Sequence, residues 1–139
     1  MENKQTKQNV GMVVVRGTSL PISTKKSVVL CKLLKNKKIE PAIKFFEEII
    51  DMKKGIKMNK RETLKPGKGT KYPIKTTKQF VKLLKNLNAN AVTKGLDVSK
   101  LVLSASANQA SRPLKAGARF RKFKRTHVKI EGKIKEDKK

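Results

Sequence analysis

A long stretch without acidic residues is the feature that most constrains this chain. Between Asp97 and Glu131 there is no Asp or Glu. Part of that stretch is densely basic and holds Arg112, Lys115, Arg119, Arg121, Lys122, Lys124 and Arg125. Like charges at this density repel one another, and the segment has few apolar side chains to bury against them. We therefore expect it to take shape against a polyanion rather than within a core.

The charge of the whole chain points to the same class of partner. Thirty-six Lys and Arg against ten Asp and Glu give its 139 residues a formal net charge of +26 and a pI of about 10.5. A pI this high is typical of nucleic-acid-binding domains. A second segment, Met52 to Gln79, is rich in Lys and contains Glu62 as its only acid. An anionic membrane surface is the alternative partner, because it also attracts Lys and Arg.

The composition excludes several other classes of protein. Cys31 is the only Cys, so no internal disulfide can form, and one Cys with one His cannot build a His/Cys metal site. No apolar run approaches the roughly 18 residues of a membrane span. His127 has no nucleophile or carboxylate near it in sequence for general-base catalysis. We expect a cytoplasmic protein without metal, cofactor or enzyme activity, in which Cys31 is a buried structural thiol.

Apolar spacing before residue 95 predicts a small globular body. The predicted elements are a strand at Met12–Arg16 and three helices, over residues 24–35, from residue 40 to before Gly55, and over residues 76–95. The segment 55–70 has no periodicity, and we expect a long loop there. Its basic content favours ordering on a polyanion, with a plain flexible insertion as the alternative.

Capping residues set the expected ends of the helices. Ser23 is the expected N-cap of the first helix, and Pro41 is expected at the first position of the second. Thr76 and Gln79 match a capping box at the start of the third helix. Gly95 is expected to stop that helix in the left-handed conformation.

After Gly95 the apolar period changes from 3.6 residues to two. Alternation predicts a long two-stranded hairpin from about Leu101 to Ile130, within a single domain over 11–134. The expected tip comprises Pro113, Leu114, Lys115, Ala116, Gly117 and Ala118. Because an isolated ribbon is marginal in water, we expect the outer part, Ser111 to Arg125, to be stable only inside an anionic host. Flexible termini are expected at 1–10 and 135–139.

The predicted binding residues combine cations with two aromatic rings. Lys and Arg neutralise phosphates, while Phe rings can stack on unpaired bases. The predicted set is Arg16, Lys25, Lys26, Arg61, Lys65, Lys68, Lys71, Arg112, Lys115, Arg119, Phe120, Arg121, Lys122, Phe123, Lys124, Arg125 and His127. For Phe120 and Phe123, packing within the hairpin is an equal alternative to base stacking. No helix carries a DNA-reading face, so folded RNA suits the set better than duplex DNA. A nucleoid-type DNA-compacting protein is the alternative function.

Several motifs together resemble the universal large-subunit ribosomal protein L-twenty-two family, called L-seventeen in eukaryotes. The resemblance covers about residues 11–134 and is closest between Tyr72 and Val98. The motifs that carry it are Ser23-Thr24-Lys25-Lys26-Ser27, Lys37-Lys38-Ile39-Glu40-Pro41-Ala42, Tyr72-Pro73-Ile74-Lys75, Lys82-Leu83-Leu84-Lys85-Asn86, Lys94-Gly95-Leu96-Asp97 and Lys124-Arg125-Thr126-His127-Val128. The long loop and its Tyr72-Pro73 exit are more similar to archaeal and eukaryotic members than to bacterial ones.

The resemblance implies an α+β fold, with three helices packed on a small antiparallel sheet and a long protruding β-hairpin. It implies a structural role in the large ribosomal subunit, with ribosomal RNA and neighbouring ribosomal proteins as partners and no homo-oligomer. The family's hairpin tip reaches the wall of the exit tunnel, so the nascent peptide is a further implied contact. The chain departs from the family in two places. Its hairpin is shorter, and residues 57–62 lack the Pro-Phe-Arg-Arg-like sequence usual in archaeal and eukaryotic members.

Overall fold

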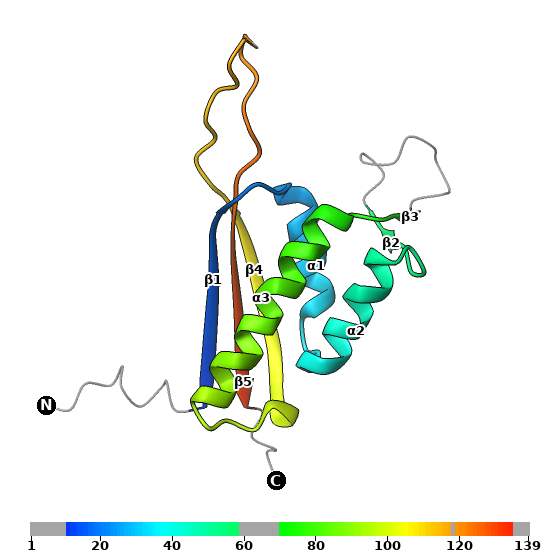
Figure 1. Ribbon diagram of the computed structural model, residues 1–139, viewed down its shortest axis with the longest axis vertical. Coiled ribbons are helices and arrows are strands. Elements are labelled where there is room, and N and C mark those ends of the chain that lie inside the picture. The colour runs from blue at the N-terminus through cyan, green and yellow to red at the C-terminus, as the bar shows by residue number, and fades with distance from the viewer. Residues whose placement is uncertain (1–10, 59–69, 118, 135–139) are drawn as a thin grey trace, which may run out of the picture.

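The computed structural model describes residues 11–58, 70–117 and 119–134 (Figure 1). Both termini, 1–10 and 135–139, lie outside the described residues. So do Arg61, Lys65 and Lys68 of the predicted loop, and Ala118 of the predicted tip. The predictions that rest on these residues therefore remain predictions.

Three antiparallel strands form the main sheet. They are β1 (Met12–Leu20), β4 (Leu101–Gln109) and β5 (Thr126–Ile134), arranged in the order β1-β5-β4. The last strand of the chain is thus the central one. β4 and β5 pair without a break along their whole length, so the predicted hairpin begins where the alternation predicts, at Leu101.

β1 is longer than its apolar residues predict. The predicted strand, Met12–Arg16, is present and continues to Leu20 because β5 supplies a partner for the added residues. A β-bulge lies between Gly17 and Leu20, where Ser19 adopts a positive φ of 50°. This bulge turns the end of β1 toward the first helix.

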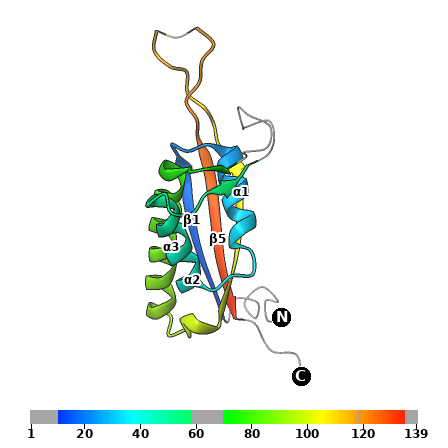
Figure 2. The same cartoon turned by 90° about the vertical axis from the view of Figure 1, so that its right-hand side faces the viewer.

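Three helices cover one face of the sheet and leave the other face open (Figures 1 and 2). They are α1 (Thr24–Leu34), α2 (Ile39–Ile50) and α3 (Ile74–Thr93). Burial along β4 follows the same division, since Leu101 and Leu103 are buried while Ser104 is exposed. The prediction of an α+β fold with three helices on a small antiparallel sheet is confirmed.

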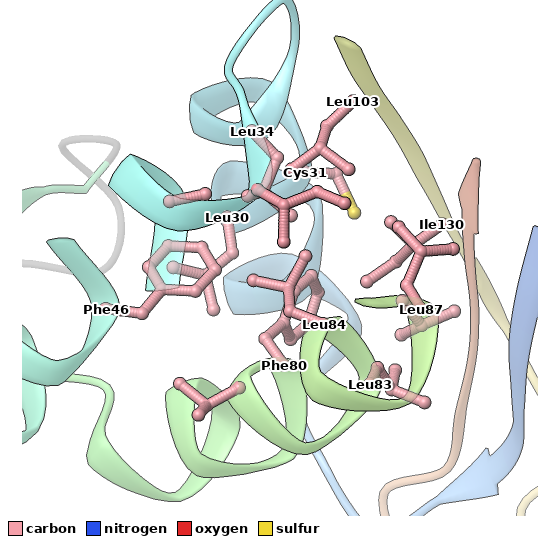
Figure 3. Packing of buried hydrophobic residues seen from close by; sticks show 14 of the residues in the cluster. Leu30, Cys31, Leu34, Phe46, Phe80, Leu83, Leu84, Leu87, Leu103 and Ile130 are labelled. Atoms are coloured by element: carbon pink, nitrogen blue, oxygen red, sulfur yellow. The ribbon is translucent and has the colours of Figure 1, made fainter. Parts of the chain in front are cut away.

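The core lies where the three helices meet the sheet (Figure 3). Phe46 of α2 and Phe80 of α3 pack edge to face, with ring centroids 6.1 Å apart and an interplanar angle of 88°. Cys31 of α1 is buried on the side of α1 that faces β4, as Figure 3 shows, and burial raises the pKa of its thiol to about 12; its burial was predicted. A thiol in this state is a packing group rather than a nucleophile.

The helix starts differ from two of the predicted caps. α3 begins at Ile74 with Pro73 as N-cap, so the predicted capping box of Thr76 and Gln79 is wrong. Thr77 instead donates its hydroxyl to the Pro73 carbonyl at 3.1 Å. α2 begins at Ile39, which makes Pro41 its third residue rather than its first. The missing N–H of Pro41 still costs nothing, because N–H groups of the first turn have no partner within the helix.

The other predicted ends are closer to the structure. Ser23 is the N-cap of α1 as predicted, although its side chain makes no capping hydrogen bond. Gly95 follows α3 with a φ of 65°, the left-handed conformation expected of it. Within the predicted loop 55–70, the two ends pair as a small second sheet of β2 (Ile56–Lys57) and β3 (Thr70–Lys71). A short 3₁₀ helix, η2 (Val98–Lys100), leads into β4.

Candidate nucleic-acid interface

An irregular arm, residues 110–125, projects beyond the sheet (Figure 1). The predicted hairpin continues through this arm, but regular strand pairing does not, because β4 ends at Gln109 and β5 begins at Thr126. Three backbone hydrogen bonds cross the described part of the arm, and their donors are Ala110, Lys115 and Phe123. Outside the regular strands, Leu114 and Lys122 form one isolated bridge.

A change of register explains why the ladder stops. The Ala110 N–H donates to the Arg125 carbonyl, whereas the Phe123 N–H donates to the Pro113 carbonyl at 2.9 Å. Two residues on the outgoing side of the arm, 111 and 112, therefore face one residue, Lys124, on the returning side. Pro113 has no N–H to give to a ladder. The sheet geometry thus ends at the body, and the arm continues as a twisted loop.

The tip lies slightly later in the chain than predicted. The Lys115 N–H donates to the Arg121 carbonyl at 3.0 Å and closes the final turn. Gly117 and Phe120 both have positive φ, 68° and 60°. Pro113 and Leu114, predicted in the tip, belong to the side of the arm. Lys115, Ala116 and Gly117 lie at the tip as predicted.

The basic side chains of the arm face solvent. Arg112, Lys115, Arg119, Arg121, Lys122 and Lys124 are exposed, and Arg125 is half-buried. Among the described residues, every ion pair involves residues of the body, and none involves the arm. The arm therefore presents a concentrated positive charge that the described part of the protein does not neutralise.

The two aromatic residues of the arm differ in their surroundings. Phe120 is 87% exposed and packs in no core, so the packing alternative is wrong for this ring. Phe123 is 46% exposed, with Lys115 Nζ 5.5 Å and the Arg125 guanidinium 6.0 Å from its centroid. Both rings therefore keep an accessible surface. Proteins that bind single-stranded nucleic acid offer exposed aromatic rings among cations, on which unpaired bases stack.

Hydrogen bonds fix the base of the arm to the body. Thr126, fully buried at the start of β5, donates its hydroxyl to the Ile22 carbonyl at 3.0 Å, and its Oγ1 lies 2.8 Å from Thr24 Oγ1. The Ser19 N–H donates to His127 Nδ1 at 3.1 Å. That bond leaves Nε2 of the exposed His127 as the ring's outward polar atom.

The structure brings only some of the other predicted residues near the arm. Lys25 and Lys26 lie in the first turn of α1, and Lys26 lines a hollow at the base of the arm. Arg16 is exposed on β1, opposite Lys129 of β5. Lys71 is half-buried in β3, away from the sheet that carries the arm.

Sequence reasoning missed one cation of this region, Lys75. It lies in the first turn of α3 and lines the same hollow as Lys26. The sequence around Lys75 gives no signal that this residue lies near the arm, which follows about 40 residues further along the chain. Lys129 and Lys133 were also missed, and both pair with Glu131 on β5. The hydrogen bond from Lys129, aided by the charges of both Lys residues, lowers the pKa of the Glu131 carboxyl.

Two kinds of site are not found in the part of the chain that the structure describes. No described helix is long and apolar enough to cross a membrane. No group of three or more His, Cys, Asp or Glu residues within 11–58, 70–117 and 119–134 could hold a metal ion.

The structure is that of a basic α+β protein with one projecting polycationic arm, a class in which nucleic acid is the usual partner. Comparison with known families narrows that class. The family model described as "Ribosomal protein L22p/L17e" matches residues 15–132. The chain belongs to this family, as the sequence motifs predict.

Curated relatives agree with the family. The chain is 39% identical over 103 residues to "Large ribosomal subunit protein uL22" of Archaeoglobus fulgidus, a match that covers 69% of this chain and 66% of the relative. It is 37% identical to the protein of that name from Methanocaldococcus jannaschii, over 61% of this chain and 59% of the relative. For Methanosphaera stadtmanae the identity is 34%, over 71% and 69%. The chain thus spans about two thirds or less of the first two relatives, and the predicted archaeal-like branch is confirmed.

Proposed function

We propose that this chain is a structural protein of the large ribosomal subunit, resident in cytoplasmic ribosomes, that binds ribosomal RNA and supports subunit assembly. The observation that carries the proposal is the arm, which combines exposed cations, exposed rings and no acid. The family and the printed names of the relatives support the same assignment. They favour it over the nucleoid-type DNA-compacting alternative.

The binding mechanism is phosphate neutralisation combined with a fit of shape. Each phosphate that a Lys or Arg neutralises releases counterions, which contributes about −0.7 to −0.9 to the slope of log affinity against log salt. The arm is only two segments of the chain wide, so it can enter a crevice of folded RNA that is too narrow for the body. Exposed Phe120 adds a surface for stacking on an unpaired base.

The remaining parts of the proposal concern the neighbours of the arm. The tip of the arm, which the hydrogen bond from the Lys115 N–H to the Arg121 carbonyl closes, is the part that would meet the exit-tunnel wall and the nascent peptide. Neighbouring ribosomal proteins are expected on the body. In this role the chain needs no cofactor, metal or catalytic step.

Replacing Arg119, Arg121 and Arg125 together with Ala tests the proposal. We expect the variant to fold, to enter large subunits at reduced occupancy and to leave them at lower salt, as measured on sucrose gradients. With isolated large-subunit RNA, the salt slope should become shallower by about two to three, one step per lost phosphate contact.

The matched control removes the same charge from the body, by replacing exposed Lys32, Lys44 and Lys82 with Ala. This control should assemble as the parent chain does. Wild-type occupancy and salt resistance of the arm variant would contradict the proposed role of the arm.

A further inference from the structure

A hollow of about 370 Å³ lies where the arm joins the body, and it is named the root pocket here. Its walls come from three places in the sequence: Pro21–Ser23 with Lys26, the start of α3 at Lys75 and Thr76, and the arm at 122–125. The side chain of Lys115 also lines the hollow, because it extends back from the tip toward Phe123. Figure 1 shows the reason, since α1 and α3 both begin at the end of the body from which the arm leaves. The pocket therefore forms only when the whole chain has folded.

The charged residues that line the root pocket are all cationic. Six of its lining side chains are basic and none is acidic: Lys26, Lys75, Lys115, Lys122, Lys124 and Arg125. The two helix starts that border it also lack acidic residues in their first turns and side-chain caps at their N-termini. Acids and caps are the usual occupants of these positions. Because Lys residues and no acids occupy both first turns, we expect the compensating negative charge to come from outside the chain.

One wall of the pocket is apolar and includes a flat ring. Phe123 lies beside Pro21 and Ile22 in the lining. Lys115 and Arg125 both approach within about 6 Å of its ring centroid, so the cationic groups and the stacking surface lie within reach of a single nucleotide. An inorganic anion would use the rim alone and leave this wall unused.

The size of the pocket limits what can enter. Its volume is at the lower end of the range of small-ligand pockets, about 300–1,000 Å³. A base that stays stacked in a duplex cannot enter such a hollow, whereas an unpaired base can be turned out of the stack. The body side of the pocket is also rigid, because the buried Thr126 hydroxyl ties Ile22 and Thr24 to the base of the arm.

We infer that the root pocket binds one unpaired nucleotide of the RNA, with its base on Phe123 and its phosphate beside Lys26 and Lys75. This inference rests on the proposed function and adds a specific contact to it. The arm supplies affinity that depends little on sequence. The root pocket makes RNA binding depend on an unpaired nucleotide at a fixed distance from the RNA crevice that the arm enters.

A pair of RNA hairpins tests the inference with the full-length chain. One hairpin carries a single unpaired 2-aminopurine in its stem, and the other has the same stem fully paired. We expect the chain to bind the bulged RNA about tenfold more tightly, the effect of one stacked base, and to quench the 2-aminopurine fluorescence. Phe123→Leu keeps the apolar bulk but removes the flat ring, so it should abolish both the preference and the quenching.

A second pair of variants tests the phosphate contact. Lys75→Gln should weaken binding of the bulged RNA severalfold more than binding of the paired RNA. Lys78→Gln removes the same charge one turn further along α3, outside the pocket lining, and should not favour either RNA. Thermal melting of each variant checks that the body remains folded.

The outcomes separate the two levels of the proposal. If the parent chain binds neither RNA, the proposed function itself fails. Equal binding of both RNAs, unchanged in Phe123→Leu, overturns the root pocket while leaving RNA binding intact. A bulge preference that survives Phe123→Leu but disappears in Lys75→Gln assigns the pocket to phosphate alone and also overturns the inference.

In assembled large subunits, ultraviolet irradiation should crosslink Phe123 to an unpaired nucleotide, as read by mass spectrometry.

Discussion

The body and the arm of this protein are held in shape by different kinds of interaction. In the body, apolar side chains of three helices and three strands are buried together, and β4 and β5 pair without a break over nine residues. In the arm, three backbone hydrogen bonds cross the described residues, and both Phe rings remain accessible. We therefore expect the body's shape to be determined within the chain and the arm's shape to depend on what surrounds it.

Amide hydrogen exchange of the isolated chain is expected to separate the two regions most strongly. Body amides such as those of Val15 and Ile130 should exchange through global unfolding, slowed about a thousandfold or more for a domain of ordinary stability. Amides from Ser111 to Arg125 should exchange nearly as fast as in an unstructured peptide. Addition of large-subunit RNA should slow the hydrogen exchange of the arm amides. Arm amides as protected in the free chain as those of β5 would remove the distinction.

Truncation of one Phe in each region measures the same difference as free energy. Phe46→Ala should lower the free energy of unfolding by about 3–5 kcal/mol, because it leaves a cavity at the centre of the core. Phe120→Ala should change it by less than about 0.5 kcal/mol, since the ring is exposed. Urea denaturation followed by circular dichroism gives both values. RNA affinity should show the opposite order. Phe120→Ala should bind RNA more weakly than the parent chain, whereas the folded fraction of Phe46→Ala should bind it as the parent chain does.

The smallest expected effect on stability concerns the open face of the sheet, where Glu131 forms ion pairs with Lys129 and Lys133. Its carboxyl has a lowered pKa because Lys129 donates to it and Lys133 lies nearby. A lowered folded-state pKa contributes stability above the unfolded pKa and loses it as the pH falls through the folded value. Glu131→Gln should therefore cost under about 1 kcal/mol at pH 7, and the difference should vanish in acid. A difference that grows as the pH falls would contradict this sign.

The body was largely predictable because its signals are local. Helical spacing of apolar residues located all three helices, and the position of Cys31 among such residues predicted its burial. Ends were less predictable, since they depend on tertiary contacts. β1 is lengthened by pairing with β5, and α3 begins before its predicted capping box because the Pro73 carbonyl accepts both the N–H and the hydroxyl of Thr77.

The candidate interface was predictable only as a list of residue types. An acid-free run of cations indicates a polyanion partner without any knowledge of geometry. The irregular path of the arm follows from a one-residue register change near Pro113, which alternation alone cannot reveal. The root pocket joins three segments that are distant in sequence, so Lys75 carries no local sign of its position.

The place of β5 at the centre of the sheet bears on how the protein is made. Among the strands that the structure describes, β1 pairs only with β5, and Met12 lies opposite Lys133, so the two partners are separated by nearly the whole described chain. Contacts this distant in sequence form late and slowly. During synthesis the strongly charged arm is complete before β5 can join β1 and β4. A newly made chain therefore passes through a stage in which the apolar faces of its strands and helices are exposed while the basic arm is already complete. Protection by a chaperone would be most valuable at that stage.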